Sequence, residues 1–191
     1  MAGKQAKLLT DAQVAGCLAQ AASGRYGGRN CVMVMLSVKA GLRAGEIAAL
    51  TWSMVSDAKG RVGQTIELED RVAKKGSGRT IPIHPELRTA LRKLKRSSDG
   101  TGTIIQSERG GAMTAASVVN WFADLYRALR FTGCSSHSGR RTFITNAARR
   151  IHRAGGSLRD VQELAGHRSI SMTQRYIEGD TDAKRRLISL L

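Results

Sequence analysis

The apolar residues of this chain follow a helical period along most of its length and change to a two-residue period in one place. The change falls between Thr65 and His84, where TIELEDRV alternates, KKGSG is typical of a turn, and RTIPIH alternates again. This segment predicts a β-hairpin. A chain with one hairpin among helical segments builds its core mainly from helices, so the expected fold class is mainly α with a small antiparallel β-sheet (α+β).

Helical segments lie on both sides of the hairpin. A capping-box pattern at Thr10 and Gln13 begins the first predicted helix. The other segments are an apolar stretch at 31–38 after a glycine-rich break at 24–28, a short helix through 46–50, and helices beginning at Pro85, Thr114, His137 (as far as Arg153) and Ser157. The most linker-like stretch, SSDGTG at 97–102, is too short to separate domains, so the 191 residues are expected to form a single domain.

The charge of the chain indicates its class of partner. Thirty-one Lys and Arg against fifteen Asp and Glu give a net charge of +16, which attracts a polyanion, so nucleic acid is the first partner to expect. No apolar run approaches the roughly 20 residues that span a bilayer, and the N-terminus has no signal sequence. Three widely spaced cysteines indicate neither a disulfide framework nor a CxxC metal site, which predicts a reduced, cytoplasmic protein.

Four separated segments carry the residues that are able to do chemistry: GLRAGEIAALTW, AKKGSGRTIPI, HSGRRTFIT and LAGHRSISMTQRYIE. Each has an ordinary explanation when taken singly. Arg43 and Glu46 have the spacing of a surface ion pair, and His137 and Arg140 have that of a basic helix lying on a phosphate backbone. Tyr176 alone is compatible with a half-buried ring whose hydroxyl is hydrogen-bonded.

Taken in order, these segments resemble the motifs of the tyrosine recombinase family, the phage-integrase type of site-specific DNA recombinases. GLRAGEIAALTW resembles the first motif, HSGRRTFIT the H-x-x-R box, and LAGHRSISMTQRYIE the nucleophile segment. The resemblance runs from about residue 10 to the C-terminus and implies the catalytic-domain fold of that family. The site residues that it implies are Arg43, Lys74, His137, Arg140, His167 and Tyr176, supported by Glu46 and Lys75.

The expected reaction is the breaking and rejoining of DNA strands. The sequence shows no cluster of histidine, cysteine or carboxylate residues that would hold a metal, so Arg43 and Arg140 are the expected clamp on the scissile phosphate. Tyr176 is the expected nucleophile, and the family pattern implies a covalent 3′-phosphotyrosyl intermediate formed without metal, ATP or another cofactor. That bond keeps the energy of the phosphodiester, which favours strand exchange over hydrolysis.

The remaining expected residues move protons or orient other groups. His137 and His167 are able to donate hydrogen bonds to the phosphate oxygens, and the resemblance implies that His137 also helps to take the tyrosine proton. Glu46 is expected to orient the cations. In the family the acid lysine typically precedes the proline of the hairpin by eight residues, which favours Lys74, and the adjacent Lys75 stays as the alternative.

The family usually carries a separate helical clamp domain ahead of the catalytic one, whereas 42 residues precede Arg43 here. We therefore expect residues 1–191 to be a single catalytic domain without the usual N-terminal core-binding domain. The expected partners are double-stranded DNA and further copies of the chain, as a dimer or tetramer on DNA, in a bacterial or phage-encoded mobile element. Two alternatives stay open: a DNA-relaxing enzyme like the type IB topoisomerases, and a non-catalytic DNA-binding module.

Overall fold

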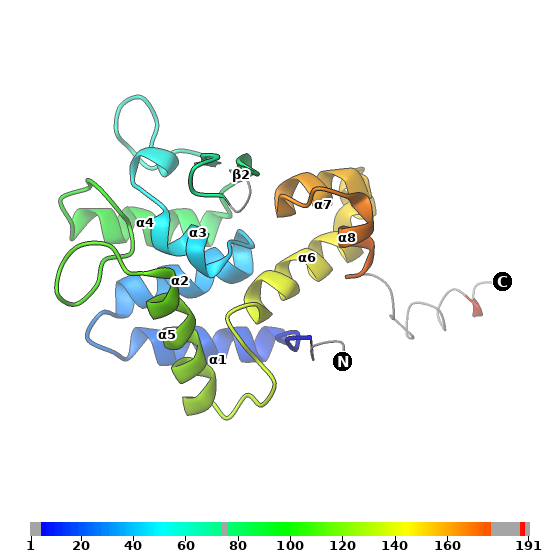
Figure 1. The fold of residues 1–191 in the computed structure, drawn as a ribbon, viewed down its shortest axis with the longest axis horizontal. Helices are drawn as coiled ribbons and strands as arrows, with labels where there is room; N and C mark the ends of the chain where they lie inside the picture. Colours follow the sequence, from blue (N-terminus) through cyan, green and yellow to red (C-terminus); the bar gives the residue numbers. More distant parts are fainter. Residues whose placement is uncertain (1–4, 74–75, 177–187, 190–191) are drawn as a thin grey trace.

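Helix α2 (Gly27–Lys39) lies at the centre of the fold because apolar side chains surround it. Its buried residues include Val32, Met33, Val34 and Leu36, which point in different directions around the helix axis. The helix packs against α1 (Asp11–Ala22), α4 (Pro85–Arg96) and α6 (Ser138–Arg150). Figure 1 shows α2 between α1 and α4.

The computed structural model describes residues 5–73, 76–176 and 188–189. The remaining elements are α3 (Ala44–Ala49), β1 (Thr65–Leu68), β2 (Arg79–Pro82), α5 (Ala115–Ala128), α7 (Leu158–Ala165) and α8 (Ile170–Gln174), with two 3-10 helices, η1 (Ser53–Val55) and η2 (Ile151–Ala154). The mainly α fold with a small antiparallel sheet is confirmed. In the part of the chain that the structure describes, no helix is long and apolar enough to cross a membrane.

The predicted hairpin is present, with strands of four residues each. β1 pairs antiparallel with β2 so that Ile66 lies opposite Ile81 and Leu68 lies opposite Arg79. Side chains two apart on a strand share a face, so Arg79 lies on the same inward face as the buried Ile81. The predicted turn includes Lys74 and Lys75, which lie outside the described residues.

The core has two parts of unequal size. The large one joins α1 to α5 and the hairpin, whereas the small one consists of Ile144 and Ala148 from α6 and Val161 and Ala165 from α7. Helix α6 packs against α2 and against α7, and Figure 1 shows it running from the large body towards α7 and α8. We call the elements around the large core the large layer and those around the small core the small layer. The first turns of α6 therefore lie where the two layers meet.

Two boundaries and one helix differ from the sequence prediction. Helix α2 begins at Gly27, inside the expected glycine-rich break, because packing of its apolar residues outweighs the poor helix propensity of glycine. The helix predicted from His137 to Arg153 ends at Arg150 and continues as η2, which Gly155 closes in a left-handed conformation. The five-residue α8 was not predicted.

Gly41 fixes the connection between α2 and α3, and replacing it with alanine should destabilise the chain. Gly41 has φ of 65°, and an added Cβ would lie 2.3 Å from Phe143 Cδ1. We expect Gly41→Ala to lower the free energy of unfolding by about 1–3 kcal/mol, through left-handed strain and crowding, in chemical denaturation. Gly60→Ala is the matched control, because Gly60 has φ of 70° and open space around its Cβ position. An equal loss in both variants would show that Phe143 moves aside without cost.

Candidate active site

Arg140 is a buried cation in the first turn of α6. It is 4% exposed, its Nη1 donates to the Gly41 carbonyl at 2.6 Å, and its Nη2 donates to the Ala165 carbonyl at 2.6 Å. Gly41 belongs to the connection before α3, and Ala165 ends α7. One guanidinium therefore holds both layers of the fold in position.

Arg140 remains positively charged although it is buried. Burial lowers its pKa to about 10, and the neighbouring positive charge of Arg43 acts in the same direction. The negative charge of Glu46 acts in the opposite direction. A group with this pKa is still a cation at neutral pH, so the site keeps a fixed positive charge.

A second cluster of charges lies at the start of α3. Arg43 Nη1 donates to Glu46 Oε1 at 2.6 Å, and Arg79 Nη2 donates to Glu46 Oε2 at 2.9 Å. Arg43 and Glu46 form the ion pair that their spacing indicates, but the pair is not on the surface, because Glu46 is 1% exposed and the Arg43 side chain 20%. Burial alone would raise the pKa of Glu46, but the hydrogen bond and charge of Arg79, together with Arg43, lower it. Glu46 is therefore a carboxylate.

His167 follows the left-handed Gly166 that ends α7. Its imidazole is buried, its Nδ1 lies 3.0 Å from Thr173 Oγ1, and its backbone carbonyl accepts a hydrogen bond from Gln162 Nε2 at 2.9 Å. Burial lowers the pKa of His167 to about 4, and the positive charges of Arg140, Arg43 and Arg79 add to the effect. The ring is therefore neutral at pH 7 and surrounded by cations.

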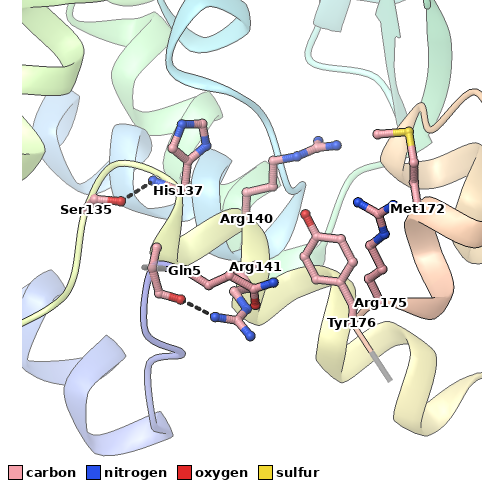
Figure 2. Close-up of a pocket in the computed structure, with 9 residues that line it drawn as sticks. Gln5, Ser135, His137, Arg140, Arg141, Met172, Arg175 and Tyr176 are labelled. Atoms are coloured by element: carbon pink, nitrogen blue, oxygen red, sulfur yellow. Dashed lines mark hydrogen bonds between the residues drawn. The ribbon is translucent and has the colours of Figure 1, made fainter. Parts of the chain in front are cut away.

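Tyr176 follows α8 and is half-buried. Its ring packs against the small core and stacks on His167, with 5.5 Å between ring centroids and 23° between ring planes. In Figure 2 its hydroxyl points into a pocket, towards the side chain of Arg140. The pocket has a volume of about 370 Å³ and is lined by Gln5, Ala6, Ser135, His137, Arg140, Arg141, Met172, Arg175 and Tyr176.

The sequence model of the phage integrase family matches residues 7–182, which is most of the chain. The chain belongs to the phage integrase family. Among similar curated proteins, the tyrosine recombinase XerC of Mesorhizobium japonicum is 31% identical over 163 residues, covering 80% of this chain and 47% of the relative. XerC of Xanthomonas campestris is 31% identical over 155 residues, covering 80% of this chain and 45% of the relative. This chain therefore spans about half the length of these relatives.

Solved integrase and recombinase structures share the fold. The crystal structure of XerA recombinase superposes with a TM-score of 0.75 at 24% identity, covering 96% of this chain and 64% of that one. A Tn1549 transposon integrase in complex with a circular intermediate DNA gives a TM-score of 0.73 at 21% identity, covering 100% of this chain and 67% of that one. The likeness extends over nearly the whole of this integrase-family chain.

The structure brings most of the expected residues to one place. His137, Arg140 and Tyr176 line the same pocket, although His137 is exposed and Arg140 is buried. His167 adjoins the pocket through its stacking on Tyr176, and Arg43 is close enough to influence the pKa of Arg140. The expected residues Lys74 and Lys75 lie outside the described residues.

Sequence reasoning missed several polar groups of this site. Arg141 and Arg175 add positive charge to the pocket lining, and Thr173 holds the ring of His167. Arg79 is the most informative omission, because it alternates with Ile81 and Ile83 on one strand face. An arginine on an apolar, inward face requires a buried acceptor, and this signal was present in the sequence.

The lowered pKa of His167 has a consequence for stability. Because the pKa lies below its ordinary value of 6.5, the unfolded chain binds this proton more readily than the folded chain. The contribution of His167 is therefore fully present above pH 6.5 and is lost as the pH falls towards about 4. We expect wild-type stability, measured by chemical denaturation between these values, to fall more steeply with acid than that of His167→Gln. Parallel curves would show that folding does not change the protonation of His167.

Proposed function

We propose that this chain is the catalytic domain of a site-specific DNA recombinase or integrase that breaks and rejoins DNA strands through a covalent 3′-phosphotyrosyl intermediate. The observation that carries the proposal is the pocket in which the Tyr176 hydroxyl points towards the buried, cationic Arg140, with His137 also in the pocket lining. The family membership supports the same reaction. The substrate is double-stranded DNA, and the net charge of +16 suits a polyanion.

In the proposed reaction, the Tyr176 oxygen attacks the phosphorus of the scissile phosphodiester in line with the leaving 5′-oxygen. The phenolic proton leaves, a tyrosine–phosphorus bond forms at the 3′ end, and the bond to the 5′-oxygen breaks. A 5′-hydroxyl from another strand then reverses the step and displaces the tyrosine. Each step exchanges one phosphoester bond for another, so ATP is not required.

Arg43 and Arg140 are the proposed clamp on the non-bridging oxygens. The transition state concentrates negative charge on these oxygens, and guanidinium groups held in advance stabilise it without reorganisation. Arg140 is held by two carbonyls, and Arg43 by Glu46, so both cations are fixed before DNA arrives. Arginine is suited to this role because its planar N–H groups bind two oxygens at once.

The histidines have different proposed roles. His167 is neutral, and a Thr173 hydroxyl that donates to Nδ1 leaves the imidazole proton on Nε2, where it is able to donate to a phosphate oxygen. Its stacking on Tyr176 also fixes the orientation of the nucleophile. His137 stands on the exposed side of the pocket, and we assign it to help in accepting the tyrosine proton.

We further propose that Lys74 protonates the leaving 5′-oxygen, with Lys75 as the alternative, and that copies of the chain assemble as a dimer or tetramer on DNA. Solved relatives include a lambda integrase dimer bound to a COC' core site and a lambda integrase tetramer bound to a Holliday junction. Because the XerC relatives are bacterial proteins, we place the reaction in the cytoplasm of a bacterium, on chromosomal or mobile-element DNA.

The nucleophile is tested by Tyr176→Phe, which removes only a hydroxyl. We expect this variant to fold and bind DNA like the wild type and to form no covalent adduct with suicide DNA substrates from the flanks of its gene, on a denaturing gel. Tyr26→Phe is the control, because the Tyr26 ring packs against Arg25 and Arg29 outside the pocket, and it should form adduct normally. Adduct in Tyr176→Phe would overturn the assignment.

Supercoil relaxation by a monomer without strand exchange would favour the topoisomerase-like alternative.

The general acid is tested with a substrate whose leaving 5′-oxygen is replaced by sulfur. Thiolate leaves without the help of a strong acid, so cleavage of this substrate should be restored in Lys74→Ala, which is slow on normal DNA. Lys75→Ala is the adjacent matched control and should need no rescue. The reverse pattern, with rescue of Lys75→Ala alone, would assign the proton to Lys75.

A further inference from the structure

Arg79 is a buried cation outside the pocket, and its side chain makes two hydrogen bonds to Glu46, where the side chain of Arg43 makes one. Its Nη1 and Nη2 donate to the two carboxylate oxygens at 3.2 and 2.9 Å, a bidentate pair. Arg43 reaches the same carboxylate with one guanidinium N–H, at 2.6 Å, and with its backbone N–H, at 3.0 Å. These four hydrogen bonds account for the acceptor positions of a carboxylate.

The sharing of Glu46 leaves donors on Arg43. A guanidinium has five N–H groups, and among the described residues the side chain of Arg43 uses one on Glu46. The Arg43 side chain is also 20% exposed, whereas that of Arg79 is 6% exposed. Arg43 is thus the partner with N–H groups left to donate to a phosphate, and both terminal nitrogens of Arg79 are bound to the acid.

Arg79 also supports the turn that carries His167. Its Nε donates to the Leu164 carbonyl at 2.9 Å, next to the Ala165 carbonyl that accepts from Arg140. These carbonyls belong to the last turn of α7, where helix carbonyls lack partners within the helix and cations are favoured. A Cβ at Gly166 would lie 2.9 Å from Arg79 Nη1, so the turn is closely packed on this guanidinium.

We propose that Arg79 is a positioning residue: by holding Glu46 in a bidentate pair, it keeps that acid from drawing the remaining donors of Arg43 away from the scissile phosphate. The inference rests on the proposed function. Without Arg79, a buried carboxylate has Arg43 as its remaining cation, and a buried charge with too few partners is costly. Arg43 then donates two guanidinium N–H groups to Glu46, and the scissile phosphate loses one of its two arginine contacts.

The mechanism predicts that removing the acid repairs the loss of Arg79. The measurement is the single-turnover rate of covalent adduct formation on a suicide DNA substrate, with DNA affinity measured in parallel. We expect Arg79→Met to cleave about 100-fold more slowly than wild type, the size of effect that follows loss of one transition-state donor. Arg79→Met/Glu46→Gln should cleave about tenfold faster than Arg79→Met, because a neutral amide releases Arg43. A double variant no faster than Arg79→Met would overturn the inference.

A purely structural role would make rate follow stability, and the matched controls test this. Arg61 and Asp57 form an exposed ion pair at 3.0 Å, so Arg61→Met and Arg61→Met/Asp57→Asn should cleave like wild type. Thermal unfolding of every variant gives the folded fraction. If Arg79→Met does not fold, Arg79→Lys and Arg79→Lys/Glu46→Gln make the same comparison, because lysine keeps the charge and loses the fork.

The failure of this inference is distinguishable from failure of the proposed function. A wild-type chain that forms no adduct on any substrate from the flanks of its gene overturns the function, and the inference with it. Adduct in the wild type, absent in Tyr176→Phe and undiminished in Arg79→Met, overturns the inference alone.

Discussion

The two hydrogen bonds from Arg140 to backbone carbonyls are the interaction on which the rest of the site depends. One carbonyl, that of Gly41, belongs to the large layer, and the other, that of Ala165, belongs to the small layer. A buried guanidinium without acceptors is costly, so burial of Arg140 requires both layers to be in place. The group that fixes the geometry therefore also contributes positive charge to the site.

The parts of the fold that were predictable from the sequence depend on local signals. The capping box at Thr10 joins side chains to backbone groups three residues away, and the hairpin appears as a change of period. Where the prediction was wrong, tertiary packing decided the outcome. Helix α2 begins as early as Gly27 because most residues of its following turns are buried, and no local pattern records that burial.

Some features of the candidate site were likewise predictable from the sequence, and others were not. The resemblance to family motifs predicted that Arg140, His137 and Tyr176 would meet, and they line one pocket. It did not predict that Glu46 is buried beneath Arg79, a partner 33 residues away along the chain. Nor did it predict that His167 is neutral, because that property follows from burial among three arginines contributed by separate elements. Packing sets the distances between elements, and the spacing of motifs along the sequence gives no information about these distances.

The small size of the second core has a consequence for the motions of the chain. Tyr176 rests against a cluster whose buried members are Ile144, Ala148, Val161 and Ala165, which is little apolar area compared with the large core. Opening of this layer alone exposes little apolar surface, so its free energy is a fraction of that for global unfolding. We therefore expect amide protons of α7 and α8 to exchange with solvent through local openings, and those of α2 through global unfolding. We expect such openings to displace the ring of Tyr176 under conditions too mild to unfold α2.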